Sequence, residues 1–208
     1  MSEFWTYFNY LVQPEGIIKF GGIYVLLAIV FIENGLFFGF FLPGDSLIFA
    51  AGLFCFTKVL PYPPLTIVLS LILSVSLGSL LGYYFGKKAG PNLYDKKESF
   101  FFRRSYLEQA EVYLHKYGGL TLILGRFLPI VRTFAPIIFG IVNYDFKKFM
   151  LLNIVGAVIW IVALFYAGYF LSERIPNAEH YLGYIIIGLI TVTSMPAIIT
   201  IVKKKYSK

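Results

Sequence analysis

The chain has 208 residues, of which 58% are hydrophobic and only 14% are charged, and its mean hydropathy is +0.75. Soluble domains are about half apolar and about a quarter charged, so this composition excludes an ordinary water-soluble protein and predicts a single integral membrane domain. The net charge of +7 does not indicate a nucleic-acid partner. The Lys and Arg residues stand at the ends of apolar segments, where basic residues orient a chain in the membrane.

The first 57 residues predict a surface segment followed by a broken apolar region. Residues 1–18 are rich in aromatic side chains, and we expect them to lie on the outer membrane surface as an interfacial segment. Residues 20–57 are apolar but too long for one helix, and the turn Pro43-Gly44-Asp45 interrupts them. We therefore predict a first re-entrant hairpin, which enters from the outer face and breaks at Pro43 and Gly44.

The next segment, residues 65–86, carries no charge and is long enough to cross about 30 Å of hydrocarbon as a transmembrane helix. Small residues recur every four positions along one face of this helix and just beyond it: Gly78, Gly82, Gly86 and Gly90. Such a stripe is typical of a surface where another helix packs closely. Residues 91–116 are polar and charged with apolar positions near helical spacing, which predicts a cytoplasmic amphipathic segment.

A second broken region spans residues 117–144. Lys116 and Lys147 bracket it, and the preference of basic residues for the cytoplasm places both flanks on that side. The segment must then enter the membrane and return, and Pro129 and Pro136 provide the breaks that such a path needs. We predict a second re-entrant hairpin, either buried in protein or lining a wet cavity.

Two further uncharged segments, residues 149–171 and 181–202, complete a set of three predicted transmembrane helices. The lysines at 203–205 and 208 place the C-terminus in the cytoplasm of a multi-pass protein of the cell (inner) membrane. Lys19-Phe20-Gly21-Gly22 opens the first hairpin and Lys116-Tyr117-Gly118-Gly119 opens the second. The predicted fold is therefore all-α, with three transmembrane helices and two opposed re-entrant hairpins in an inverted-repeat arrangement.

Four ionisable residues lie inside the two broken regions: Glu33, Asp45, Arg126 and Arg132. A charge at the centre of a membrane helix costs roughly 2.5 to 3.5 kcal/mol, so each needs a partner. Pro129, between the two arginines, allows both guanidiniums to point inward, where they suit a phosphate that each can grip with two hydrogen bonds. The two carboxylates either pair with the arginines or carry protons, and both roles stay open. Fixed ion pairs that only hold the hairpins together are the structural alternative.

At these positions the sequence resembles the DedA family of membrane proteins, also called the SNARE-associated Golgi protein or VTT-domain family. The matching elements follow in the expected order: Glu33, the turn Phe41-Leu42-Pro43-Gly44-Asp45, the glycine stripe with Tyr83, the motif Arg126-Phe127-Leu128-Pro129-Ile130-Val131-Arg132, Pro136 and Gly140. Ser79 is a departure, because many members carry an acidic residue there. Whatever that acid contributes to coupling or pairing is in doubt in this chain.

The resemblance implies lipid transport. Bacterial members are implicated in moving undecaprenyl phosphate or phosphatidylethanolamine between leaflets, often with dependence on the proton-motive force, and eukaryotic relatives scramble phospholipids. We therefore expect a flippase for a phosphate-bearing lipid, with undecaprenyl phosphate preferred, Arg126 and Arg132 on the phosphate, and Glu33 and Asp45 pairing or coupling protons. A flippase or scramblase of phosphatidylethanolamine or other phospholipids is one alternative.

Two other function classes stay open: a proton-coupled transporter of small ions or cationic solutes, and a membrane-organising protein that transports nothing. We do not expect an enzyme, because no nucleophile with a credible base accompanies the arginines. No metal, cofactor or nucleic-acid partner is expected either. The expected partners are the lipid substrate and the surrounding membrane lipids, and whether the chain forms a homo-oligomer stays open.

Overall fold

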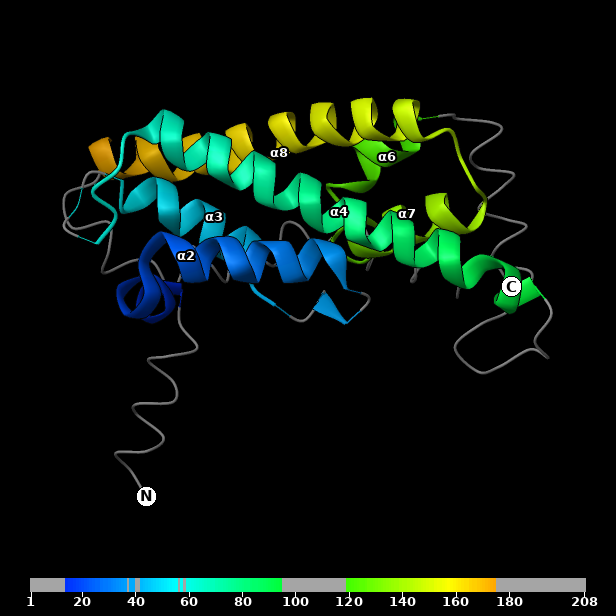
Figure 1. The fold of residues 1–208 in the computed structure, drawn as a ribbon. Helices are drawn as coiled ribbons and strands as arrows, with labels where there is room; N and C mark the ends of the chain where they lie inside the picture. The colour runs from blue at the N-terminus through cyan, green and yellow to red at the C-terminus, as the bar shows by residue number, and fades with distance from the viewer. Residues whose placement is uncertain are drawn as a thin grey trace, which may run out of the picture. The chain divides into compact units, whose positions relative to one another are not determined.

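The computed structural model describes residues 14–36, 38–39, 42–55, 57, 59–94 and 119–174. These residues are helical, apart from turns and one isolated bridge between Cys55 and Leu60. The helices, shown in Figure 1, are α2 (Pro14–Gly35), α3 (Gly44–Leu53), α4 (Pro64–Tyr94), α6 (Leu120–Gly125), α7 (Pro129–Ile141) and α8 (Phe146–Arg174). The predicted all-α class is confirmed for this part of the chain.

Within the described ranges, three helices have stretches long and apolar enough to cross a membrane: Gly16–Gly35 of α2, Pro64–Gly90 of α4 and Phe146–Arg174 of α8. The last two contain the predicted segments 65–86 and 149–171, which are confirmed as apolar helices of membrane-spanning length. The predicted span 181–202 lies outside the described residues. α4 also continues beyond its predicted end to Tyr94, because a helix can extend past the hydrocarbon when its lysines reach water.

The first broken region, predicted as a hairpin over residues 20–57, contains two helices of unequal length. α2 is long enough to span by itself, and Gly22 interrupts it with a φ of 55°, a conformation that residues with a Cβ rarely adopt. Pro43 precedes α3 and Gly44 is the first residue of that helix, so a break between two helices does occur at the predicted turn. The re-entrant path itself stays a prediction.

The second broken region contains α6 and α7, which contact each other across the break at 126–128. Leu128 is extended, with φ −110° and ψ 112°, as a residue before proline prefers, and Pro129 begins α7. Pro136 was predicted as a second break, and this is corrected: it lies inside α7, which continues past it to Ile141. Membrane helices tolerate an internal proline where a neighbouring helix packs against it. A Cβ added to Gly82 of α4 would stand 3.3 Å from Cβ of Pro136.

Three sequence predictions fall largely outside the described residues. Of the interfacial segment 1–18, only residues 14–18 are described, and they belong to α2. Of the amphipathic segment 91–116, only residues 91–94 are described, and they belong to α4. The second copy of the repeated opening pattern, 116–119, is described only at Gly119, and the inverted repeat stays a prediction.

The chain divides into two compact units. The first comprises Met1–Val30, Leu42–Ser74 and Ile159–Lys208, and in its described part α3 packs closely on α8. A Cβ at Gly52 of α3 would collide with the backbone carbonyl of Phe165, and one at Gly168 of α8 with the carbonyl of Phe49. Ser74 adds a hydrogen bond from its Oγ to the carbonyl of Leu27 at 2.7 Å.

The second unit comprises Phe31–Phe41 and Val75–Val158, and the glycine stripe of α4 belongs to it. A Cβ at Gly86 would collide with the backbone carbonyl of Ile137 in α7, and one at Gly140 of α7 with the carbonyl of Tyr83. Gly78 approaches the end of α2 in the same way, with its added Cβ 3.2 Å from the backbone nitrogen of Gly35. The stripe therefore lies on the face of α4 that the backbones of α7 and of the end of α2 approach closely.

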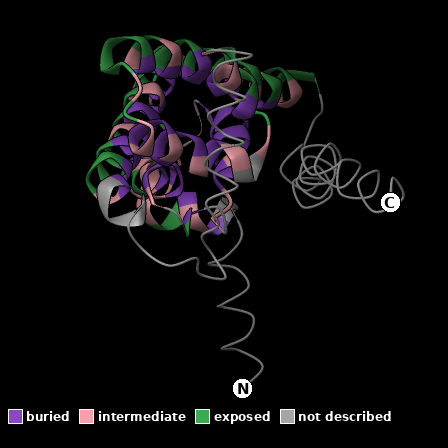
Figure 2. Ribbon diagram, turned by 90° about the vertical axis from the view of Figure 1, so that its right-hand side faces the viewer, coloured by how far each residue is buried: buried purple, intermediate pink, exposed green. Residues whose placement is uncertain are grey.

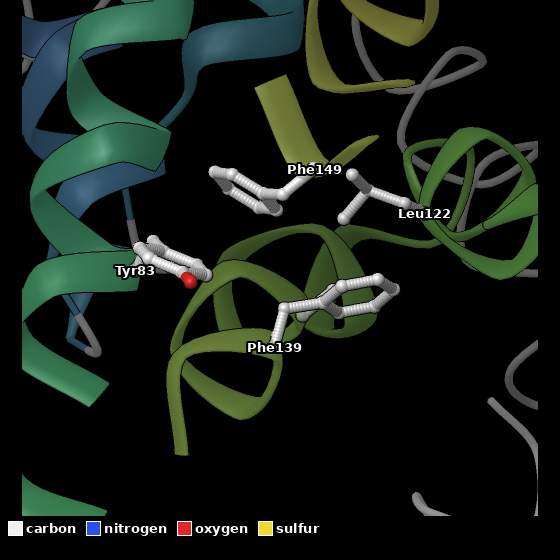
Figure 3. Packing of buried hydrophobic residues seen from close by; sticks show 5 residues of the cluster. Tyr83, Leu122, Phe139 and Phe149 are labelled. Atoms are coloured by element: carbon white, nitrogen blue, oxygen red, sulfur yellow. The ribbon is translucent and has the colours of Figure 1, made fainter. Parts of the chain in front are cut away.

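An aromatic cluster fills the core of the second unit (Figure 3). Within the cluster, the ring of Tyr83 stacks on the ring of Phe149, with the two ring centroids 4.6 Å apart. Phe139 and Leu122 also belong to the cluster. The Tyr83 hydroxyl donates a hydrogen bond to the backbone carbonyl of Tyr144 at 2.6 Å. The cluster joins α4, α6, α7 and α8, the four helices that carry or adjoin the buried polar groups described below.

Apolar side chains cover the exposed side of the long helices as well as the buried side. On α4 the exposed leucines recur every four residues: Leu65, Leu69, Leu73, Leu77 and Leu81. Figure 2 shows exposed and buried residues on the same helices. A helix that is apolar all round and still half exposed has lipid rather than water as its solvent.

Candidate functional site

Among the described residues, three charged side chains are buried: Glu33, Arg126 and Arg132, with exposed fractions of 1%, 3% and 4%. All three belong to the second unit. Asp45, the fourth ionisable residue singled out in the sequence, is half-buried in the first turn of α3 and belongs to the first unit. The site described here is therefore built around one carboxylate and two guanidiniums.

Arg132 and Glu33 form a buried ion pair. Arg132 lies in the first turns of α7, and Glu33 lies in the last turn of α2. The Nη2 atom of the arginine donates a hydrogen bond to Oε1 of the carboxylate. Removing either partner from a buried pair leaves the other charge uncompensated, which costs several kcal/mol.

Arg126 has a different environment, although it is buried to the same degree. It follows α6 at the break before α7. Its Nη2 donates hydrogen bonds to Oγ of Ser79, at 3.3 Å, and to Oδ1 of Asn153 on α8. Gly156, one turn further along α8, leaves room for the side chain, since an added Cβ would stand 2.8 Å from Cδ of Arg126.

Several donors around Arg126 have no acceptor in the described part of the chain. Nε and Nη1 of Arg126 are buried without a hydrogen-bond partner, and so is Nδ2 of Asn153. A buried donor left unsatisfied costs roughly 1 to 3 kcal/mol, and more when the group is charged. Such groups in a native protein call for an explanation, and a bound acceptor is one of the recognised ones.

The charges of the site do not balance. Both hydrogen-bond partners of Arg126 are neutral, and the one buried carboxylate among the described residues is bonded to Arg132. A guanidinium cannot escape the cost of burial by losing its proton. The site therefore carries one surplus positive charge together with free N–H donors, which is the arrangement that binds an oxyanion.

Asn153 is the residue that sequence reasoning missed. It is a polar amide inside the uncharged, predominantly apolar span predicted at 149–171, and a polar residue inside a membrane helix is a signal for a functional site. The sequence argument selects site residues by their charge, and asparagine is neutral. Ser79 had been noted as a departure from the family pattern, and the structure places it on Arg126.

Several known proteins are similar in sequence to this chain over most of its length. The VTT domain model matches residues 42–170. Protein DedA of Escherichia coli K12 is 37% identical over 181 residues, which cover 87% of this chain and 82% of the relative. An uncharacterized membrane protein of Mycobacterium tuberculosis is 39% identical over 178 residues, covering 84% of this chain and 76% of the relative.

Inner membrane protein YghB of Escherichia coli K12 is 31% identical over 190 residues, which cover 88% of this chain and 85% of the relative. No solved structure matches the chain. The family model covers more than half of the chain, and the relatives cover most of it. The resemblance seen in the sequence is thereby confirmed, and the chain belongs to the VTT-domain, or DedA, family of membrane proteins.

Proposed function

We propose that this protein is a flippase that moves a phosphate-bearing lipid between the leaflets of the membrane, with undecaprenyl phosphate as the favoured substrate. The observation that carries the proposal is Arg126, a buried cation whose Nε and Nη1 have no acceptor among the described residues. The oxygens of a phosphate would accept hydrogen bonds from these donors and neutralise the charge. Neither effect is available from the neutral side chains that now hold the arginine.

The surroundings of the site favour a lipid over a soluble anion. The long helices expose apolar side chains on the faces that do not pack, such as the leucines of α4, so an acyl or prenyl tail finds an apolar environment there. A phosphate head group instead needs buried donors, which Arg126 and Asn153 offer. The head group would bind in the protein while the tail stays in the lipid.

Phosphatidylethanolamine and other phospholipids are the alternative substrates, because they also carry a phosphate. Undecaprenyl phosphate is favoured slightly, since it needs no further polar pocket beyond the phosphate donors. A transporter of cations is less well supported, because the surplus charge of the buried, described residues is positive. A purely structural role fits the Glu33–Arg132 pair, but it leaves the unsatisfied donors of Arg126 unexplained.

Proton coupling, which we include in the proposal, would act through Glu33. In the structure Glu33 is ionically paired with Arg132. A proton that neutralised the carboxylate would release the second guanidinium, so that both arginines could hold the phosphate during its passage. Asp45, half-buried at the start of α3, is the second candidate for a proton-carrying group.

The test is the movement of labelled undecaprenyl phosphate between leaflets of liposomes that contain purified protein, with and without a pH gradient. Labelled phosphatidylethanolamine is assayed in parallel. We expect fast movement with the wild type, loss of movement with Arg126→Met, and unchanged movement with Arg174→Met. Arg174 is a matched control because it is an exposed arginine at the end of α8.

A folded wild-type protein that moves neither lipid under any condition would refute the proposal. So would an Arg126→Met protein that moves lipid as fast as the Arg174→Met control. Faster movement of phosphatidylethanolamine than of undecaprenyl phosphate would exchange the favoured substrate and keep the transport function. Dependence on the pH gradient that disappears with Glu33→Gln would support the proton-carrying role of that residue.

A further inference from the structure

We infer that the stacked rings of Tyr83 and Phe149 form a gate that closes the Arg126 site toward the lysine-flanked end of the second unit. This is the end where the exposed Lys87 and Lys148 lie. Opening the gate separates the two rings, and Phe149 is the ring that moves. The inference rests on the proposed function only in the identity of the group that passes the gate, the phosphate of a lipid. The closure itself depends on packing alone.

Three residues of α4 form successive levels along one face of the helix. Lys87, Tyr83 and Ser79 follow one another at intervals of four residues, so they lie one above another, about 6 Å apart along the axis. Lys87 is exposed, whereas Tyr83 is buried in the aromatic cluster. Ser79 accepts the hydrogen bond from Nη2 of Arg126. From the exposed end inward, the order is therefore a lysine, an aromatic ring and the arginine site.

The same order occurs at the start of α8. Lys148 is exposed, and the next residue, Phe149, is buried in the aromatic cluster. Asn153 follows Phe149 by four residues on the same face, and its Oδ1 accepts a hydrogen bond from Nη2 of Arg126. Arg126 thus joins α8 to α4, and the ring stack joins the same two helices one turn nearer the lysines. A group that approaches Arg126 between these helices from the lysine-flanked end meets the rings first.

The level of the two rings is tightly packed. Tyr83 and Phe149 have exposed fractions of 1% and 0%, and their ring centroids are 4.6 Å apart. Phe139 of α7 and Leu122 of α6 are each 2% exposed and pack in the same cluster (Figure 3). Interiors packed in this way contain few voids larger than a water molecule. A phosphate head group is larger than water, so it cannot pass this level until the rings separate.

Tyr83 is the fixed half of the gate. Its hydroxyl donates a hydrogen bond to the backbone carbonyl of Tyr144 at 2.6 Å. Its own carbonyl lies against Gly140 of α7, where an added Cβ would collide with it. The side chain of Phe149 has no polar group, and its ring contacts are with Tyr83 and with Phe139, whose ring centroid is 6.0 Å away. Moving the ring of Phe149 therefore breaks no hydrogen bond, whereas moving that of Tyr83 does.

The experiment measures how fast a cysteine behind the gate reacts with an anionic, water-soluble methanethiosulfonate reagent. The variant Ser79→Cys places a thiol one turn beyond Tyr83, and Cys55→Ser in the same chain removes the native thiol. Lys87→Cys, also combined with Cys55→Ser, places the thiol in front of the gate. The full chain is studied in sealed membrane vesicles, in the orientation in which Lys87→Cys reacts. Thermal unfolding of the extracted protein in detergent checks that each variant is folded.

With both rings intact, we expect Ser79→Cys to react about a hundredfold more slowly than Lys87→Cys, because its thiol is reached only during transient openings. Adding Phe149→Ala should raise the rate at Ser79→Cys by about tenfold or more, since removal of the ring leaves a cavity in the gate. The milder Phe149→Leu should raise the rate less. Leu151→Ala, at an exposed position of the same helix, is the matched control and should leave the rate unchanged.

A second readout connects the gate to the ligand. The phosphodiester probe is the short-chain lipid dihexanoyl phosphatidylglycerol, and its binding to the folded protein raises the thermal unfolding midpoint in detergent. The probe should slow the reaction of Ser79→Cys combined with Phe149→Ala, because a phosphate bound to Arg126 shields the neighbouring thiol. Probe affinity should be the same in Phe149→Ala and the wild type, since the phenylalanine ring offers the phosphate no hydrogen-bond donor.

The outcomes separate the gate from the function. If Ser79→Cys with intact rings reacts as fast as Lys87→Cys, the rings do not close the site and the inference is wrong. It is also wrong if the folded Phe149 variants react no faster than the Leu151→Ala control. If Phe149→Ala does not fold, Phe149→Leu decides the question. A folded wild type that does not bind the probe would remove the phosphate site and the proposed function, whereas a gate demonstrated by the thiol rates would stand.

Discussion

The two arginines of the second broken region are buried equally deeply, yet they have opposite electrostatic environments. Arg132 is 4% exposed and ion-paired with Glu33, whereas Arg126 is 3% exposed and bonded only to the neutral groups of Ser79 and Asn153. The same residue type, six positions apart, thus has a charged partner in one place and only neutral partners in the other. Burial alone does not identify a binding residue. The charge of the groups bonded to each arginine is what distinguishes the two.

The difference divides the roles between the two arginines. The Arg132–Glu33 pair connects α7 to the end of α2, so we propose that it stabilises the second unit as long as Glu33 is ionised. Arg126 is hydrogen-bonded only to neutral partners, and its Nε and Nη1 donors have no acceptor among the described residues. We therefore propose that Arg126 binds the ligand. If this division is right, substitutions at the two sites should change stability and binding in different proportions.

The largest effect on stability is expected from Glu33→Gln. The substitution leaves Arg132 buried without its counter-charge, and breaking one partner of a buried pair typically costs about 3 to 5 kcal/mol. Unfolding of the detergent-solubilised protein by a chemical denaturant measures the loss. The double variant Glu33→Met with Arg132→Met should recover most of it, since an apolar pair of similar volume replaces the ions. A single variant as stable as the wild type would show that the pair does not hold the unit together.

Arg126→Met should separate binding from stability. The variant removes an uncompensated buried charge, so the unfolding free energy without ligand should stay unchanged or rise. Binding of the phosphodiester probe should fall by roughly 3 kcal/mol or more, about a hundredfold, because at least two charge-assisted hydrogen bonds of roughly 1.5 to 3 kcal/mol each are lost. Probe titration and denaturant unfolding on the same preparation measure both quantities. A large loss of stability would contradict the assignment, because Arg126 would then be structural like Arg132.

A smaller change is expected from Gly156→Ala. The new Cβ would stand 2.8 Å from Cδ of Arg126, so the arginine side chain must shift. We expect probe binding to weaken by about 1 kcal/mol, roughly fivefold, which is the lower end of the cost of overpacking. Probe titration is again the measurement, and Val155→Ala at the exposed neighbouring position is the control. Equal binding by both variants would mean that the position of Arg126 does not matter to the ligand.

The smallest effect is expected from Tyr83→Phe, which tests whether the unit can be weakened without touching either arginine. The variant loses the hydrogen bond from the Tyr83 hydroxyl to the carbonyl of Tyr144 and keeps the aromatic stacking on Phe149. A hydrogen bond of this kind contributes about 1 kcal/mol, so the denaturant midpoint should fall slightly. Probe affinity should not change, and a clear change would show that the aromatic cluster and the arginine site are coupled.

Much of the fold could be predicted from the sequence because lipid makes strict demands on it. Uncharged stretches of sufficient length predicted α4 and α8, and the glycine spacing marked the face of α4 that meets neighbouring backbones. Two predictions about the broken regions were incomplete or wrong. The turn Pro43-Gly44-Asp45 suggested a hairpin, and the sequence did not show that α2 is long enough to span by itself. Pro136 was given the helix-breaking effect that proline has in water, whereas packing against Gly82 accommodates it.

The site could be predicted in part. Buried charges are rare enough in membrane segments that Glu33, Arg126 and Arg132 were recognised from residue type alone. The pairing of Glu33 with Arg132 joins residues 99 positions apart, and no sequence spacing specifies such a contact. Asn153 was missed because its importance lies in a neighbour, Arg126, that only the folded chain brings beside it.

The polar ends of two helices give the depth of the Arg126 site. Ser79 lies eight residues before the exposed Lys87 on α4, and Asn153 lies five residues after the exposed Lys148 on α8. At 1.5 Å per residue these separations are about 12 Å and about 8 Å, roughly a third of the hydrocarbon thickness. A singly charged head group that reaches Arg126 from the lysine-flanked face has therefore crossed about a third of the transmembrane electric field. A membrane potential of 100 mV would change its binding free energy by only about 0.8 kcal/mol, and most of the voltage dependence of transport would fall on the remaining two thirds of the path.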